Sequence, residues 1–445
     1  MKNTDIILIV IDCARYDHIS YHGYDRKTTP NIDALAKDCV VYHNHFTTAG
    51  WTLPSISSIF TGLFPHNHGM HNENTIFDNS VRTLAQILSE NGYNCHLLAT
   101  NDWLSSSTKI NVGFSNQPDF QSSKIGRLIR NIKLQLGIST DKGSKKITDY
   151  SLKIIKEKGN KPNFTFMLFP DTHLPYYYPA NFAEDFTDGK FLNLSKSIPG
   201  VRKHYAGIEK LNDETQKNYL DLYDGSLKYT DFCIGKIIQN LKMEKMYDES
   251  MVIITADHGE NLGDNGHMDH YYTLDDNLIH VPLLVKYPYS TKIGDEYKLV
   301  QNIDLLPTIT DLFDMKIDKL DGISLLSDEE REYVLSERFK DYKRGVSSTY
   351  SDLELDDIVM YEKSRRISIR DKKYKLIWEE NSRHRFFEIL NDCSEKELPI
   401  DHPKFENYLK IARKIYEKYF KVIASKDASF DSDATERLRA LGYMD

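Results

Sequence analysis

Four short apolar runs limit what this chain can fold into, because each is typical of a buried strand and each ends abruptly in polar residues. Uninterrupted apolar strands suit a parallel sheet that is covered on both faces. Helical patterns lie between the runs, which is the alternation expected of a doubly wound α/β fold. The runs and the polar residues that follow them are IILIVI (6–11) before Asp12, CHLLAT (95–100) before Asn101 and Asp102, FTFMLF (164–169) before Asp171 and His173, and MVIITA (251–256) before Asp257 and His258.

In a doubly wound sheet, ligands bind outside the carboxyl ends of the strands. All four polar tips are therefore expected to face one crevice. Loop capping explains a single acid or histidine at one strand tip equally well, but four such tips together favour a functional site.

The stretch AGWTLPSISSIFTGLFPHNHG, residues 49–69, is predicted to be a loop that leads into a helix. Pro54 suits the first helical position, Gly62 marks the expected end, and apolar residues recur between them at the spacing of one buried face. Thr52 then lies at or just before the helix N-terminus. One interpretation is an N-cap. The other is a hydroxyl placed where free N–H groups and the positive end of the helix dipole receive a phosphoryl or sulfuryl group.

Asp12, Asp257 and His258 supply two carboxylates and an imidazole, which together can hold one divalent cation. Thr52 as a fourth ligand makes the site reactive, because a metal lowers the pKa of a bound hydroxyl and turns it into a nucleophile near neutral pH. The same cation can stabilise an oxygen of the transferred group. This ligand set fits Mn²⁺, Mg²⁺, Ca²⁺ or Zn²⁺.

Three further side chains are candidates for handling the substrate. His173 and His270 are expected to hold or protonate the leaving group, because the pKa of an imidazole lies nearest neutrality. Arg15 follows Asp12 by three residues and can pair an anion or a carboxylate bidentately.

Composition excludes several other classes of protein. A net charge of −9 gives no electrostatic footprint for nucleic acid, and 28% charged with 40% hydrophobic residues is ordinary for a soluble globular protein. No apolar run approaches about 18 residues, so no transmembrane span is expected, and residues 6–11 are expected to be a strand rather than a signal peptide. Five scattered cysteines without a CxxC pair indicate reduced thiols and a cytoplasmic protein.

The chain is predicted to divide into a catalytic domain, residues 1–325, and a C-terminal subdomain, residues 326–445. A charged stretch at about 115–160 interrupts the first domain and is expected to be a solvated insertion with a basic amphipathic helix that carries Arg127, Arg130 and Lys133. A membrane-surface or substrate-recruiting role for this helix is the alternative. After residue 325, the strand-like RRISIR, YKLIW and FFEIL and one charged helical pattern predict a small antiparallel sheet with a packed helix.

At this point several segments, in order along the chain, resemble the sulfatase-like branch of the alkaline phosphatase superfamily. The match in DHGENLGD (257–264), taken in order with the others, is the most specific. The segments are VIDCARYDHISYHGYDRKTTPNIDALAKD (10–38), GWTLPSISSIFTGLFPHNHG (50–69), DTHLPYYYP (171–179), TADHGENLGDNGHMDH (255–270), LPTITDLF (306–313), DGISLL (321–326) and ISIRDKKYKLIW (367–378).

The resemblance implies an alkaline-phosphatase-like three-layer α/β/α sandwich with a smaller C-terminal α+β subdomain built on an antiparallel sheet. It implies that His173 is the substrate-contacting histidine and that His270 stands where a second basic residue contacts the transferred group. The remaining family positions agree with the residues chosen above: metal ligands at Asp12, Asp257 and His258, and the nucleophile at Thr52.

The chain also departs from the sulfatase pattern. Sulfatases carry Cys or Ser in a C/S-x-P-S/A-R loop and convert it to formylglycine, whereas the loop here reads TLPSI (52–56), so no formylglycine is expected. Asn101 replaces the usual Lys and His after the second apolar run and is a candidate substrate-binding residue. Asp12 follows Ile11 where an adjacent acidic pair is usual, which favours one divalent metal ion.

A threonine nucleophile beside an Asp-His pair resembles the phosphoglycerol and phosphoethanolamine transferases of the superfamily, which are membrane proteins. We therefore expect a metal-dependent phosphoester hydrolase in which Thr52 forms a covalent phospho-enzyme. The substrate is expected to be a small-molecule, glycan-linked or lipid-linked anionic ester. Transfer to an acceptor alcohol, hydrolysis of sulfuric esters and a non-catalytic scaffold are the alternatives. The metal's identity and the oligomeric state stay open.

Overall fold

The computed structural model describes residues 4–120, 141–187, 200–270, 272–318, 320–340, 362–391, 393–420 and 432–440. The basic helix predicted around Arg127, Arg130 and Lys133 lies outside these residues. Within the described part of the chain, no helix is both long and apolar enough to cross a membrane. The five cysteines form no disulfide among the described residues; four are buried and Cys393 is exposed.

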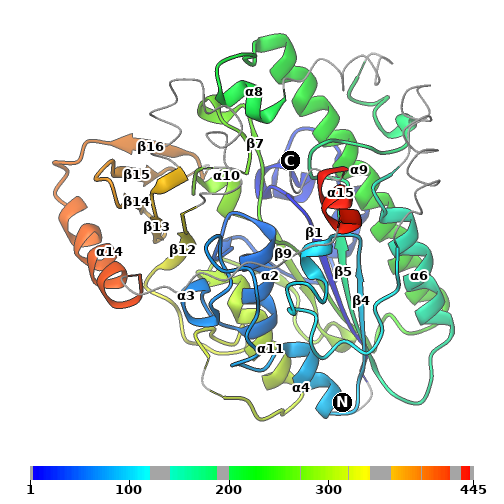
Figure 1. Cartoon of the computed structure of the whole chain (residues 1–445). Helices are drawn as coiled ribbons and strands as arrows, with labels where there is room; N and C mark the ends of the chain where they lie inside the picture. The colour runs from blue at the N-terminus through cyan, green and yellow to red at the C-terminus, as the bar shows by residue number, and fades with distance from the viewer. Residues whose placement is uncertain are drawn as a thin grey trace.

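The four predicted strands lie side by side and make up one side of a seven-stranded sheet (Figure 1), in the order β10-β2-β9-β6-β1-β5-β4. The neighbours β6, β1, β5 and β4 are mutually parallel, and β9 runs antiparallel to both of its neighbours. The α/β prediction is therefore confirmed. The strands of this sheet are β1 (Ile6–Ile11), β2 (Val40–Tyr42), β4 (Asn94–Ala99), β5 (Asn163–Phe169), β6 (Met251–Ala256), β9 (Leu283–Lys286) and β10 (Gly294–Glu296).

The register of the parallel strands brings their polar tips to one level. Ile11, the last residue of β1, lies opposite Phe169 on β5 and Ala256 on β6. The next residues along, Asp12 and Asp257, therefore emerge side by side at the carboxyl edge of the sheet. Among the described residues, two small two-stranded sheets complete this half of the molecule, one formed by β3 (His45–Phe46) with β11 (Val300–Gln301) and one by β7 (Asn261–Leu262) with β8 (Met268–Asp269).

Helices cover both faces of the sheet, and every β1 side chain is therefore buried. Ile7, Ile9 and Ile11 pack into a core with α1, α6 and α9, whereas the alternate residues of β1 pack into a second core with α2, α4 and α11. This is the predicted three-layer sandwich (Figure 1). The helices of this part are α1 (Pro30–Ala36), α2 (Thr52–Thr61), α3 (Pro65–His68), α4 (Leu84–Glu90), α6 (Ser144–Lys156), α8 (Val201–Tyr205), α9 (Asp213–Met243), α10 (Asp276–Ile279) and α11 (Leu305–Leu312).

Two of these helices add detail to the sequence patterns. One of the helical patterns expected between the strands is NIDALAKDCVVYH, residues 31–43. It is helical only as far as Ala36, and its β-branched residues Val40 and Val41 join the sheet as β2. Helix α6 lies inside the stretch predicted as an insertion and packs against α9 and β5.

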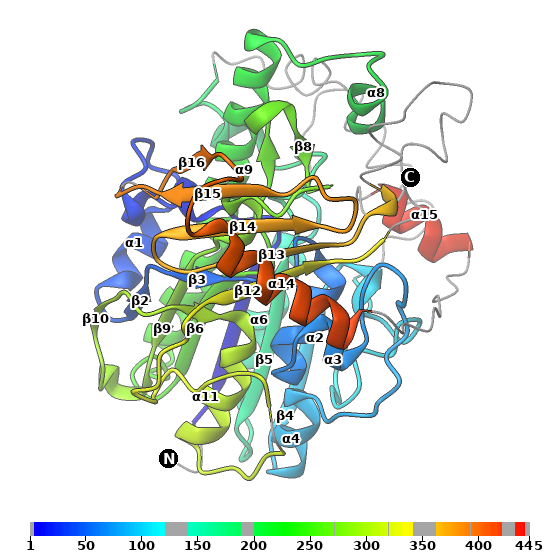
Figure 2. The same ribbon diagram turned by 90° about the vertical axis from the view of Figure 1, so that its left-hand side faces the viewer.

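The C-terminal half contains a five-stranded antiparallel sheet in the sequential order β12 to β16, with α14 packed on it (Figure 2). The three strand-like runs predicted there are β13, β14 and β15. The elements are β12 (Val334–Arg338), β13 (Arg366–Arg370), β14 (Tyr374–Glu379), β15 (Arg385–Ile389), β16 (Glu395–Leu398), α14 (Phe405–Tyr419) and α15 (Ser432–Ala440), the last of which contributes Leu438 to the core of the large sheet.

A buried ion cluster ties this second sheet to α10. Asp276 accepts hydrogen bonds from Arg370 of β13 at 2.9 Å and Lys375 of β14 at 2.8 Å. Burial opposes ionisation of Asp276, but these two cations hold its pKa well below the usual range. The carbonyls of Leu278 and Asn277 on α10 in turn accept hydrogen bonds from the backbone N–H groups of Gly259 and Glu260. The antiparallel sheet thus supports the loop that follows β6.

We expect Asp276→Asn to lower the free energy of unfolding by roughly 3–5 kcal/mol, because it leaves Arg370 and Lys375 buried next to a neutral side chain. Urea unfolding measures this loss. Asp318→Asn is the control, since the Asp318 side chain is 82% exposed in its pair with Arg82 and removal of such a pair costs at most about 1 kcal/mol. Similar losses in the two variants would contradict the proposed support.

Candidate active site

Thr52 is the first residue of α2, and Trp51 with an extended backbone is the N-cap. No side-chain hydrogen bond caps this helix, so the N-cap interpretation of the Thr52 hydroxyl is wrong. The helix begins two residues before the predicted start at Pro54, and it ends as predicted at Gly62, whose φ of +67° is left-handed. The Thr52 hydroxyl oxygen instead lies 3.3 Å from Nε2 of His258.

Asp12, Asp257 and His258 converge on this hydroxyl, and all three are fully buried. Nε2 of His258 lies 3.7 Å from Oδ1 of Asp12 and 3.5 Å from Oδ2 of Asp257. The other oxygen of Asp257 accepts backbone N–H groups from Cys13 at 3.2 Å and His258 at 2.9 Å. The structure therefore brings the four predicted metal-binding residues into one cluster.

The donor atoms of the cluster fit a cation. Nδ1 of His258 donates to the carbonyl of Gly259 at 2.8 Å, so the neutral ring presents its lone pair at Nε2. Burial, followed by the charge of His270, lowers the pKa of His258 to about 4, and burial raises the pKa of Asp257 to about 7. Three converging acceptors disfavour one another unless a cation lies among them, and oxygen and imidazole donors are ordinary ligands of divalent metals.

A buried polar network fixes α2 relative to β6. The Ser55 hydroxyl donates to the carbonyl of Asp257 at 2.6 Å and is bound by the side chains of Thr47 at 2.7 Å and Asn302 at 3.0 Å. The nucleophile candidate and the metal-binding strand tip are consequently held by one hydroxyl. On the opposite side, the Thr172 hydroxyl donates to the carbonyl of Asp12 at 2.5 Å.

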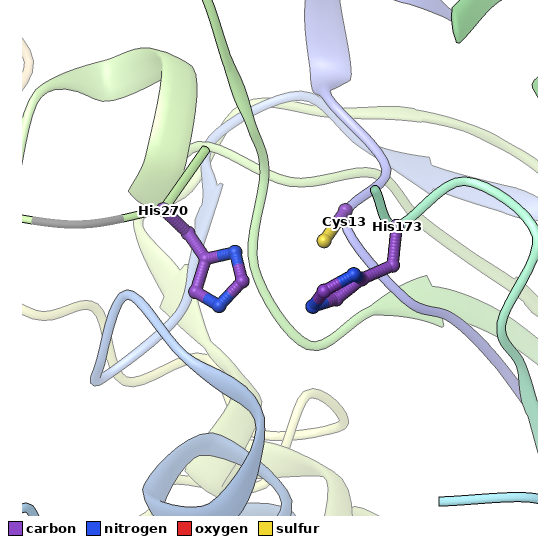
Figure 3. A group of neighbouring side chains, drawn as sticks. All are labelled: Cys13, His173 and His270. Carbon is purple, nitrogen blue, oxygen red and sulfur yellow. The ribbon is translucent and has the colours of Figure 1, made fainter. Parts of the chain in front are cut away.

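His173 and His270 face each other beside this cluster (Figure 3), with ring centroids 5.0 Å apart. The His270 ring also lies 4.5 Å from that of His258. Burial opposes protonation of His270, but the carboxylate of Asp269 at 2.5 Å from Nδ1 raises its pKa to about 9. Burial and the neighbouring charge of Lys142 lower the pKa of His173 well below its usual range. One imidazole of the pair is therefore cationic at neutral pH and the other is neutral.

Lys142 orients His173 through a shared carbonyl. Nδ1 of His173 donates to the carbonyl of Leu174 at 2.5 Å, and Nζ of Lys142 donates to that same carbonyl at 3.1 Å and to the carbonyl of His173 at 2.9 Å. Asp171 accepts the backbone N–H of Lys142 at 2.8 Å and the hydroxyl of Ser144. The start of α6 is thus fastened to the tip of β5.

The two predicted substrate-binding residues lie in different surroundings. The guanidinium of Arg15 binds both oxygens of Asp17, Asp264 at 2.6 Å and the carbonyl of Glu260 at 3.2 Å, so its N–H groups are directed at the loop after β6. Asn101 is buried, and its carbonyl oxygen accepts the backbone N–H of Trp103 at 2.9 Å. Its Nδ2 has no hydrogen-bond partner among the described residues.

Three residues of the site were missed in the sequence. Cys13 and Glu260 are fully buried next to predicted ligands, and both adjoin strand-tip residues, which is the signal that singled out Asp12 and Asp257. Lys142 is buried as well, but it belongs to a charged stretch that is typical of a solvated surface, and nothing in the local pattern marks it as part of a site.

Two family models match the sequence of this chain. The chain matches the family model described as Sulfatase over residues 4–315. Residues 263–423 match the model of the C-terminal region of N-sulphoglucosamine sulphohydrolase.

Individual relatives are distant in sequence. The chain is 21% identical to the N-acetylglucosamine-6-O-sulfatase of Bacteroides thetaiotaomicron, over 84% of this chain and 78% of that protein. It is 21% identical to the choline-sulfatase of Rhizobium meliloti, over 90% and 83%. It is 24% identical to the multifunctional alkaline phosphatase superfamily protein PehA of Trinickia caryophylli, over 73% and 77%.

Solved structures share the fold. The phosphonate monoester hydrolase of Agrobacterium radiobacter superposes with a TM-score of 0.73 at 20% identity, covering 93% of this chain and 95% of that one. The corresponding enzyme of Silicibacter pomeroyi gives a TM-score of 0.71 at 18% identity, covering 94% and 95%. Because the sulfatase match spans well over half of its length, the chain belongs to the sulfatase family of ester hydrolases.

Proposed function

We propose that this chain hydrolyses phosphoric esters with Thr52 as the nucleophile. The observation that carries the proposal is the position of the Thr52 hydroxyl, which caps no helix and lies 3.3 Å from the lone pair of His258 beside two buried carboxylates. Asp12, Asp257, His258 and Thr52 are the residues that would hold one divalent cation. Such a cation lowers the pKa of a bound hydroxyl and withdraws charge from the transferred group.

The first half-reaction transfers the phosphoryl group to Thr52. The Thr52 hydroxyl gives up its proton to solvent, and its oxygen forms a bond to phosphorus. The bond between phosphorus and the leaving alcohol oxygen breaks, and the leaving oxygen takes a proton from His270. The raised pKa of His270, near 9, supports this assignment because the ring carries a proton to donate at neutral pH.

The second half-reaction releases phosphate. Water attacks phosphorus and gives up a proton, and the bond between phosphorus and the Thr52 oxygen breaks. The Thr52 oxygen and His270 each take a proton from solvent, which restores the starting state. His173 suits the role of base toward this water, because its Nδ1 proton is engaged by Leu174 and its lowered pKa keeps Nε2 able to accept a proton. The buried Nδ2 of Asn101 suits a contact with an oxygen of the transferred group.

Two alternatives share this machinery. Membership of the sulfatase family, together with relatives named as sulfatases, favours sulfuric esters as the second candidate substrate. A threonine cannot give the formylglycine aldehyde, so a sulfate ester would pass through a sulfo-threonine instead. An acceptor alcohol in place of water would make the enzyme a transferase. Cysteines that form no disulfide in the described part of the chain support action in a reducing compartment.

A panel of aryl phosphate monoesters and diesters, aryl phosphonates and aryl sulfates, assayed with each of Mn²⁺, Mg²⁺, Ca²⁺ and Zn²⁺, tests the proposal. We expect phosphoester turnover to exceed sulfate turnover. Thr52→Ala is expected to reduce kcat by at least roughly 10³-fold, because it removes the hydroxyl that lies 3.3 Å from Nε2 of His258. Acid-quenched wild-type enzyme should yield a peptide with a phosphoryl group on Thr52, detected by mass spectrometry.

Thr61→Ala is the matched control, since Thr61 is a buried threonine of the same helix whose hydroxyl donates to the carbonyl of Ser57. This variant is expected to keep wild-type kcat. Undiminished turnover by Thr52→Ala would refute the nucleophile assignment. Turnover of aryl sulfates together with a sulfated Thr52 peptide would show that sulfuric esters, and not phosphoric esters, are the substrates. Formation of a phosphorylated alcohol when an acceptor alcohol is added would establish phosphoryl transfer.

Lys142→Met is expected to lower kcat by about 100-fold with a small change in KM, because His173 loses the donor that fixes its hydrogen-bonded carbonyl. Steady-state kinetics measure the effect, and urea unfolding reports any folding cost separately. Lys146→Met is the matched control, because Lys146 lies four residues away on an exposed surface and also donates to a backbone carbonyl, that of Phe120. Equal kcat values for the two variants would show that Lys142 does not position His173.

A further inference from the structure

Cys13 turns its side chain into the site through an unusual backbone. Its φ is +63°, which is uncommon for a residue other than glycine. Both backbone polar groups hold this turn: the N–H donates to Asp257 at 3.2 Å, and the carbonyl accepts from the Tyr223 hydroxyl at 2.8 Å. The direction of the Cys13 side chain is therefore fixed by residues far away in the sequence.

The sulfur of Cys13 lies among the predicted metal ligands. It is fully buried, 3.3 Å from Oδ1 of Asp12. The sulfur, a carboxylate oxygen of Asp12 and a ring nitrogen of His258 all lie within 4.8 Å of one another. Figure 3 shows the same sulfur close to the rings of His173 and His270. It thus stands at the border between the metal-binding cluster and the two catalytic histidines.

Other thiols of the chain behave differently. Cys39 and Cys95 are equally buried, but their thiols lie against the backbone carbonyls of Leu35 at 3.2 Å and Ala85 at 3.4 Å. Cys13 faces a carboxylate that belongs to the ligand set. In addition, the fully buried Asp257 accepts the backbone N–H of Cys13 on Oδ1 at 3.2 Å and lies with Oδ2 3.5 Å from Nε2 of His258, so both of its oxygens face residues of the proposed metal site.

We propose that the sulfur of Cys13 is a ligand of the same cation as Asp12, Asp257 and His258, and that the site consequently takes a thiophilic divalent ion of the zinc class. On binding, the S–H bond breaks, its proton leaves to solvent, and a sulfur–metal bond forms. Thiolate and imidazole donors favour Zn²⁺ over Mg²⁺ and Ca²⁺, which prefer oxygen ligands. The inference rests on the metal centre of the proposed function and narrows the identity of its metal.

Cobalt substitution tests the sulfur ligand without an activity assay. The parent protein carries Cys393→Ser, which removes the exposed thiol, and its metal is exchanged for Co²⁺. We expect a sulfur-to-cobalt charge-transfer band in the near ultraviolet. The band should be lost in Cys13→Ser and kept in Cys95→Ser, a matched substitution of an equally buried thiol that lies on β4.

X-ray absorption at the zinc edge of the zinc-loaded wild-type protein gives a second measurement that needs no variant. The proposal expects one sulfur neighbour at about 2.3 Å. Stoichiometric Co²⁺ with no charge-transfer band, or zinc without a sulfur neighbour, would overturn the sulfur ligand and leave the oxygen and nitrogen ligands standing. Failure to bind any divalent ion would overturn the metal centre and with it the proposed function.

Discussion

The candidate site depends on the register of two adjacent parallel strands, which end at the same level. Because β1 and β6 pair in register up to Ile11 and Ala256, two carboxylates emerge side by side in a fully buried position. Such a pair is unfavourable by itself, since burial and like charge both oppose ionisation. Its persistence in the fold is understandable if the energy of a bound cation offsets the repulsion, and the lone pair of His258 completes the set.

Much of the surrounding structure serves to hold these groups in place. Ser55 joins α2 to the carbonyl of Asp257, and Thr172 joins the loop after β5 to the carbonyl of Asp12. Carbonyls of α10 accept hydrogen bonds from the backbone of the loop after His258. These contacts link segments that are far apart in the sequence. The antiparallel C-terminal sheet contributes no side chain to the cluster itself among the described residues, but its two buried cations fix α10 from behind.

Features that depend on local pattern were predictable, and features that depend on distant partners were not. The strands follow from uninterrupted apolar runs, and the meeting of Asp12, Asp257 and His258 follows from parallel strands that share one edge. The N-terminus of α2 was placed two residues too late because Pro54 is compatible with more than one early helical position. The contacts of Arg15 are set by Asp17 and Asp264, and no pattern in the sequence distinguishes an arginine held in this way from one that binds substrate.

A buried lysine from the charged stretch before α6 lies next to the cluster. Sulfatases place a lysine after the strand that here ends before Asn101, so this chain lacks a cation at that point. Lys142 supplies a buried positive charge from the start of α6, and its pKa falls to about 8 through burial, despite the opposing charges of Asp12 and Asp171. Its ammonium group donates to the carbonyls of His173 and Leu174. The Leu174 carbonyl also accepts Nδ1 of His173, so the lysine fixes the group that holds this imidazole. In the proposed reaction, Lys142 therefore positions His173, and the contact with the transferred group is assigned to Asn101.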